Sequence, residues 1–272
     1  MIVGTQSYTW HQVCAEQGKK LNDHWADVLP LVAQSGCQAI EHNSDAIGSP
    51  ELADRMAALL AQHGLKMPSV YAGSRLHDDG WEQSVATVLK QALFAKQLGA
   101  SVLVTNPQPL QQDKTDAELR CQAEAMNTLG RELAAMGIRL AFHNHTPEMR
   151  ASAREFHHMM LGTDPKHVGL CLDTHWIYRG AGNSQVALYD IVKLYGARIA
   201  SLHIRQSRDG IWAQTLCDGD IDYRPLVATL RDLRFTGPMI MEQAIEKGTP
   251  TDLAPVERER RSREWVRQVF GV

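Results

Sequence analysis

Short apolar runs alternate with longer amphipathic segments eight times along the 272-residue chain. The apolar runs have the length and composition of buried strands, which predicts strands at Ile2–Thr5, Ala39–Glu41, Lys66–Tyr71, Ser101–Thr105, Arg139–His143, Val168–Asp173, Ile199–Ile204 and Met239–Glu242. Apolar residues at three- and four-residue spacing predict helices over Pro50–His63, Trp81–Leu98, Asp116–Met136 and Val186–Tyr195. Each of these helices is followed by a glycine, the residue that most often ends a helix.

This alternation predicts one α/β domain over residues 1–272, folded as a (β/α)₈ or TIM barrel. Eight strand–helix units of roughly 25–40 residues each suit this fold, which takes about 250 residues. A doubly wound open sheet is the alternative. It is less favoured because no GxGxxG follows the first strand and no P-loop motif occurs. No linker or change of composition divides the chain.

Polar residues gather at the C-terminal ends of the predicted strands. Four runs begin apolar and end in His, Asp or Glu, namely AFHNHTPE (141–148), GLCLDTHW (169–176), ASLHIRQ (200–206) and PMIMEQ (238–243). In a parallel barrel these ends share one rim, where the chemistry of the fold takes place. The rule brings together Glu41, His143, His145, Glu148, Asp173, His175, His203 and Glu242. Carboxylate oxygens and imidazole nitrogens suit one divalent metal ion (Mn, Zn, Co, Fe or Mg), and such a site points to an enzyme.

The amino-acid composition indicates which classes of partner and which cellular compartment to expect. With a net charge of −3 and a pI near 6.5, the chain does not have the strongly basic composition of a nucleic-acid-binding protein. No apolar stretch approaches the ~20 residues of a membrane span. The five cysteines contain no CxxC pair, and no signal peptide is visible, so we expect a cytoplasmic protein.

The chain resembles the xylose isomerase-like TIM-barrel superfamily of sugar isomerases, epimerases and keto-inositol dehydratases. The resemblance is carried by LDTHW (172–176), LHIRQS (202–207), DGDIDY (218–223) and MEQ (241–243). Members of this superfamily hold one divalent metal with Glu, Asp, His and Glu from four strand ends. Carried over, this implies Asp173, His203 and Glu242 as metal ligands.

The fourth ligand departs from the pattern of the epimerases, in which the fifth strand ends in Glu. Here His143, Asn144 and His145 stand at that point, and His143–Glu148 fits the HNHxxE pattern of one subgroup. That resemblance implies Glu148 as the fourth ligand, which frees His143 or His145 for proton transfer. The alternative is that His143 binds the metal itself. We favour Glu148.

The resemblance implies a metal-dependent isomerase or epimerase that removes a proton next to the carbonyl of a keto-sugar, polyol or cyclitol. His143, His145 and Glu242 are the catalytic candidates, and the substrate-binding candidates are Glu41, His175, Arg205, Trp10 and Asn106. Because a histidine would replace one of the two epimerase glutamates, β-elimination by a keto-inositol dehydratase or keto-glycoside lyase is the alternative.

Two proteins of other classes share this barrel. One is a non-catalytic sugar-binding barrel. The other is a three-zinc DNA-repair nuclease of the endonuclease IV family, which needs ligand-type histidines at the ends of strands two and three. It is disfavoured because the second strand offers only Glu41 and His42, the third ends in Tyr71, Ala72 and Gly73, and the acidic charge balance argues against a DNA-binding face. Superfamily members are often dimers or tetramers, so a homo-oligomer is left open.

Overall fold

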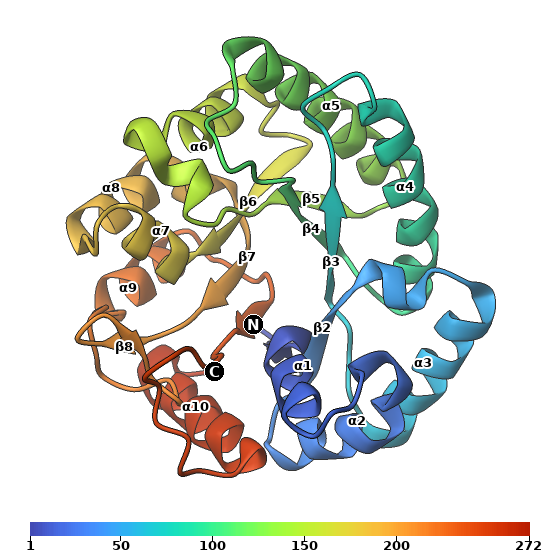
Figure 1. Cartoon of the computed structure of the whole chain (residues 1–272), viewed down its shortest axis with the longest axis vertical. Helices are drawn as coiled ribbons and strands as arrows, with labels where there is room; N and C mark the ends of the chain where they lie inside the picture. Colours follow the sequence, from blue (N-terminus) through green and yellow to red (C-terminus); the bar gives the residue numbers. More distant parts are fainter.

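Eight parallel strands close into a barrel in the computed structural model, which describes residues Met1–Val272 (Figure 1). Around the barrel the strands follow the order β1-β10-β7-β6-β5-β4-β3-β2. Their bounds are β1 (Val3–Gln6), β2 (Ala39–Asn43), β3 (Ser69–Ser74), β4 (Val102–Pro107), β5 (Arg139–Phe142), β6 (Val168–Asp173), β7 (Ile199–Ile204) and β10 (Met239–Met241). The predicted fold class is confirmed. The largest displacement is at β3, which begins at Ser69 rather than Lys66 because Pro68 has no N–H to donate to a ladder.

Helices surround the barrel and connect its strands. They are α1 (Ser7–Glu16), α2 (Trp25–Gln34), α3 (Pro50–His63), α4 (Trp81–Gln97), α5 (Asp116–Ala135), α6 (Arg150–Gly162), α7 (Thr174–Gly180), α8 (Gln185–Tyr195), α9 (Arg224–Asp232) and α10 (Pro255–Phe270). Short 3₁₀ turns are η1 (Leu21–Asp23), η2 (Ser44–Ile47), η3 (Pro147–Met149) and η4 (Gly196–Arg198). A hairpin of β8 (Ser207–Arg208) and β9 (Ile211–Trp212) lies outside the barrel. All four helices predicted by periodicity are present, each within one residue at either end.

Local signals explain where the helices begin and end. Thr115 and Glu118 form a reciprocal capping box that starts α5. Ser49 accepts a hydrogen bond from the Leu52 N–H at the start of α3, and Gly64 ends that helix at a φ of 64°. Such caps fix where each helix meets the barrel.

The strand alternation separates two cores. Leu103, Leu140 and Leu170 face the helices and belong to the large hydrophobic cluster outside the barrel. The residues beside them point inward and form a small separate cluster of Val102, Val104, Ala141 and Cys171. Because side chains on a strand repeat every two residues, the positions two beyond Ala141 and Cys171 also face the barrel axis, at its C-terminal rim. These positions are His143 and Asp173.

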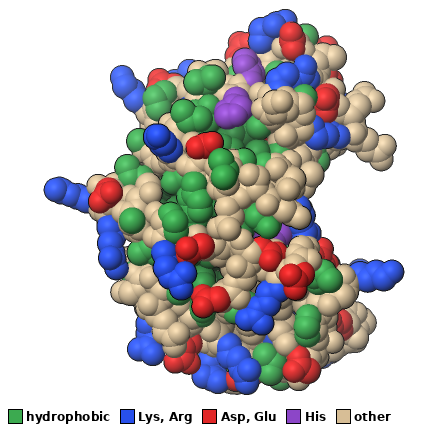
Figure 2. Space-filling model, turned by 90° about the vertical axis from the view of Figure 1, so that its left-hand side faces the viewer, with side chains coloured by type: hydrophobic (Ala, Val, Ile, Leu, Met, Phe, Trp, Pro, Cys, Tyr) green, Lys and Arg blue, Asp and Glu red, His purple; other side chains and the backbone are tan.

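The outer surface carries scattered apolar side chains. Val186 and Leu194 on α8 and Leu161 on α6 are exposed. Figure 2 shows hydrophobic side chains interspersed with charged ones on the face that includes α8. None of the helices has both the length and the hydropathy of a membrane span. A homo-oligomer stays a prediction.

Glu259, a carboxylate on α10, is buried away from the barrel mouth. It is 1% exposed, Oε2 has no hydrogen-bond partner, and burial raises its pKa from 4.5 to about 7. Because the folded chain holds this proton more tightly than the unfolded chain, stability falls as the pH rises from about 4.5 through about 7. We therefore expect Glu259→Gln to stabilise the protein by about 3 kcal/mol at pH 8 and to have little effect below pH ~4.5.

Urea denaturation at both pH values measures this difference. Glu264→Gln is the matched control, because Glu264 lies on the same helix and is exposed. This control should change stability by less than about 0.5 kcal/mol. An equal effect of Glu259→Gln at both pH values would contradict the assignment of a buried, proton-binding carboxyl.

Candidate metal centre and active site

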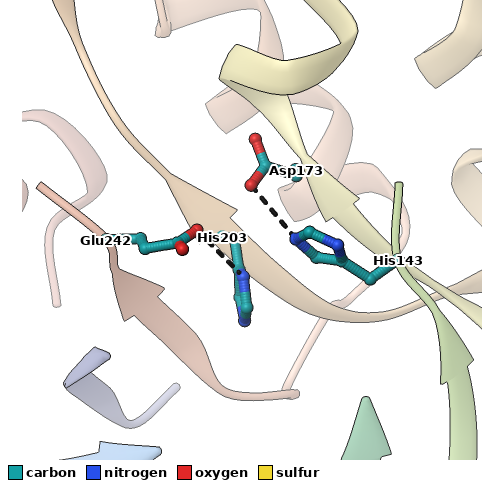
Figure 3. A group of neighbouring side chains, drawn as sticks. All are labelled: His143, Asp173, His203 and Glu242. Carbon is teal, nitrogen blue, oxygen red and sulfur yellow. Dashed lines mark hydrogen bonds and ion pairs between the residues drawn. The ribbon is translucent and has the colours of Figure 1, made fainter. Parts of the chain in front are cut away.

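Four side chains converge at the C-terminal mouth of the barrel. His143, Asp173, His203 and Glu242 each offer one ligand atom, and these atoms all lie within 4.8 Å of one another (Figure 3). They lie at or directly after the C-terminal ends of β5, β6, β7 and β10, which are neighbours in the barrel. Nε2 of His143 is 3.3 Å from Oδ2 of Asp173, and Nδ1 of His203 is 3.3 Å from Oε2 of Glu242. We call these residues the four-residue group.

Burial and neighbouring charged side chains shift the pKa values of all four residues in this group. Burial lowers the pKa of His143 to about 3, which keeps this imidazole neutral. Burial and the nearby Glu242 raise the pKa of Asp173. Burial alone would raise the pKa of Glu242 too, but Arg205 and His203 lower it, so this side chain is a carboxylate. Burial also opposes the charging of His203, yet Cys171 and Glu41 beside its ring raise its pKa.

This donor set fits a divalent cation. Two imidazoles and two carboxylates are the ligand types of zinc and of the neighbouring transition metals. Oε2 of Glu242 and Nδ1 of His203 are buried and have no well-oriented hydrogen-bond partner in the protein. Buried polar atoms normally have a partner, so these two are available to a ligand that the protein does not supply.

Asp173 uses its two carboxylate oxygens differently. Oδ1 accepts hydrogen bonds from the backbone N–H groups of His175 (3.0 Å) and Trp176 (2.8 Å), which caps α7. Oδ2 faces His143. One side chain therefore both starts a helix and belongs to the four-residue group.

Glu148, the favoured fourth ligand in the sequence analysis, lies outside the four-residue group. Its side chain is buried, and Oε2 accepts a hydrogen bond of 2.7 Å from the backbone N–H of His145. Burial raises the pKa of this carboxyl. The position in the group belongs to His143, which was the alternative.

Asn106 fixes the tautomer of His145. Its Nδ2 donates to the carbonyl oxygen of His143 at 3.0 Å, so the amide oxygen is the atom that faces Nδ1 of His145 at 3.2 Å. Nδ1 of His145 must then carry the proton, because an amide oxygen can only accept. Burial lowers the pKa of His145 to about 4. Its Nε2 lone pair is therefore free at neutral pH, and the ring lines the cavity described below.

The residues expected to bind substrate are buried and do not line the cavity at the barrel mouth. The guanidinium of Arg205 lies 4.0 Å from the ring centre of Trp212 and 3.2 Å from Oε1 of Glu242. His175 is buried with Nε2 3.1 Å from the Ser207 hydroxyl. The remaining members of this set, Trp10, Asn106 and Glu41, are also buried, and none of the five lines the cavity.

A cavity of about 650 Å³ opens beside the four-residue group. Its inner wall includes Tyr71, His143, His145 and Glu242. Its outer wall comes from the ends of β1 and β2 and the segments that follow them, with Gln6, Ser7, Tyr8, His11, Lys20, Leu21, Asn22, Asp23, His42, Asn43 and Asp45. The sequence alone did not predict this outer wall. The strand-end rule could have found Gln6 and Asn43, but the η1 turn carries no comparable signal.

Comparisons with known proteins agree with this architecture. The family model described as xylose isomerase-like TIM barrel matches residues 29–269. The inosose dehydratase of Histophilus somni is 23% identical over 253 residues, which cover 82% of this chain and 83% of that protein.

Solved structures share the fold at low identity. D-psicose 3-epimerase of Clostridium cellulolyticum, solved with D-tagatose, superposes with a TM-score of 0.77, 15% identity and 99% coverage of both chains. A xylose isomerase-like TIM-barrel protein of Mycobacterium smegmatis, solved with magnesium, superposes with a TM-score of 0.73 and 18% identity over 93% of this chain and 91% of that one. With the family model spanning nearly the whole barrel, this chain belongs to the xylose isomerase-like TIM-barrel family.

Proposed function

We propose that this protein is a divalent-metal-dependent enzyme that removes a proton next to the carbonyl of a keto-sugar or cyclitol. The observation that carries the proposal is the four-residue group, with its ligand atoms within 4.8 Å of one another beside a 650 Å³ cavity. We further propose His143, Asp173, His203 and Glu242 as the ligands. Bound there, the metal would act as a Lewis acid on the substrate's carbonyl and neighbouring hydroxyl oxygens.

His145 is the proposed general base. It lines the cavity, its Nε2 lone pair is free, and its low pKa keeps it unprotonated at neutral pH. Asn106 holds the proton on the opposite nitrogen. Polar groups of the outer wall, such as Lys20, Asn22 and Asp23, are placed to hydrogen-bond hydroxyls of a substrate that fills the cavity.

The fate of the abstracted proton decides the reaction. If a proton returns to the same carbon from the opposite face, the outcome is epimerisation. If it is delivered to the former carbonyl carbon, the outcome is isomerisation. If the hydroxyl on the next carbon leaves as water, the outcome is dehydration. The four-residue group contains a single glutamate, whereas the epimerases use two metal-bound glutamates on opposite faces of the substrate. We therefore favour dehydration of a keto-inositol, the reaction that the name of the Histophilus somni protein describes.

Metal analysis and solvent exchange together test the function. We expect about one Mn²⁺ or Zn²⁺ per chain by mass spectrometry. With an inosose in D₂O, we expect either deuterium next to the carbonyl or a product lighter by one water. Treatment with EDTA should stop the reaction, and added Mn²⁺ should restore it. Metal binding with neither exchange nor dehydration of an inosose or a ketohexose would contradict the enzyme and favour a sugar-binding barrel.

A further inference from the structure

The imidazole of His203 lies between two carboxylates. Nδ1 is 3.3 Å from Oε2 of Glu242, and Nε2 is 2.8 Å from Oε1 of Glu41. Figure 3 shows Nδ1 on the side of the four-residue group and the second ring nitrogen on the opposite side. Glu41 belongs to β2 and His203 to β7, which are not neighbours in the barrel. The contact between these two side chains therefore crosses the barrel interior.

Glu41 has no other cationic partner. Its side chain is 0% exposed, and neither oxygen accepts a well-oriented hydrogen bond from any donor. A buried carboxylate without compensation costs several kcal/mol, so a neighbouring positive charge or N–H is needed. The basic side chain within ion-pair distance is His203. Glu41 also lies outside the lining of the cavity, which argues against contact with a substrate bound there.

We propose that Glu41 is a positioning residue for His203, an inference that rests on the proposed metal-dependent function. The negative charge of its carboxylate, 2.8 Å from Nε2 although not aligned for a standard hydrogen bond, favours the ring proton on that nitrogen, which leaves the Nδ1 lone pair directed at the four-residue group. Histidines that bind metals usually direct their other ring N–H to a carboxylate, a carbonyl or a water molecule, which fixes the tautomer and the ring orientation. Glu41 would then act on metal affinity and would not contact the substrate.

Titration with Mn²⁺, followed by the electron paramagnetic resonance signal of the free ion, tests this role without any substrate. We expect Glu41→Ala to weaken Mn²⁺ binding by about 10- to 100-fold. Glu41→Gln should stay within a few-fold of wild type, because its amide oxygen can still accept the Nε2 proton. Glu259→Gln is the matched control, since it removes an equally buried carboxylate away from the mouth and should leave Mn²⁺ affinity unchanged.

Each other outcome has a distinct meaning. Unchanged Mn²⁺ affinity in Glu41→Ala, with an increased KM, would overturn the proposal and return Glu41 to substrate binding. A loss as complete as that of a ligand variant would make Glu41 itself a ligand. If Glu41→Ala does not fold, Glu41→Met supplies similar length without an acceptor, and equal affinity of the Met and Gln variants would overturn the proposal. A wild-type chain that binds no metal would overturn the proposed function as well.

Discussion

Asp173→Asn will abolish divalent-metal binding and reduce kcat/KM by about 10³-fold or more, while the protein stays folded. The magnitude corresponds to several kcal/mol of lost charge stabilisation. Metal binding can be lost without unfolding because the two carboxylate oxygens of Asp173 have different partners. The asparagine oxygen can still accept the N–H bonds of His175 and Trp176 that cap α7. The amide that replaces Oδ2 donates instead of accepting, so it makes a poor ligand.

Asp173→Ala should also abolish metal binding. In addition, it removes the cap of α7, which should lower the stability by about 1 kcal/mol. Asp222→Asn is the matched control, because Asp222 also stands before a rim helix, where Oδ1 accepts a bond from the Arg224 N–H. It lies outside the four-residue group and should retain metal and activity. Calorimetric titration with Mn²⁺ and the inosose assay measure both properties. Full metal binding by Asp173→Asn would contradict the proposed ligand set.

His143→Ala will lose metal, whereas Glu148→Ala will keep it and lose activity by about 10- to 100-fold. His143 offers a ligand atom to the four-residue group, while Glu148 accepts the backbone N–H of His145. Removing Glu148 leaves that partly buried N–H without its partner and loosens the turn that holds the proposed base. A base displaced by about 1 Å can cost this much in rate.

Glu148→Gln serves as the conservative control for this comparison. Its amide oxygen can replace the carboxylate as acceptor from His145, so most of the activity should return. Metal content by mass spectrometry and turnover of an inosose are the two measurements. Loss of metal in Glu148→Ala with retention in His143→Ala would restore the ligand assignment that the sequence alone favoured.

The sequence predicted the barrel and most of the four-residue group, because both depend on strand periodicity. Asp173 and His203 stand in strands whose inner positions alternate with residues of the large outer core. Glu242 directly follows β10. Parallel strands in a closed barrel bring these ends to one rim without any knowledge of side-chain conformation.

What the sequence could not decide lies just beyond the strands. β5 ends at Phe142, and the 3₁₀ turn η3 then places the Glu148 carboxylate against the backbone of His145. The HNHxxE pattern contains both His143 and Glu148, and it does not indicate which of the two side chains faces the barrel axis. Glu41 meets the strand-end rule, yet it contacts His203 across the barrel and not the cavity.

The barrel closes where β1 pairs with β10, two strands from opposite ends of the chain, with Val3 opposite Met239 and Thr5 opposite Met241. Glu242 follows this last strand, so a chain growing on the ribosome possesses His143, Asp173 and His203 well before Glu242, the fourth of the proposed ligands, exists. The four-residue group is thus complete only after the docking event that closes the barrel. Under the proposed ligand set, a metal ion supplied during synthesis would meet all four ligands only after β10 has docked against β1 and β7, which ties loading of the metal to closure of the barrel.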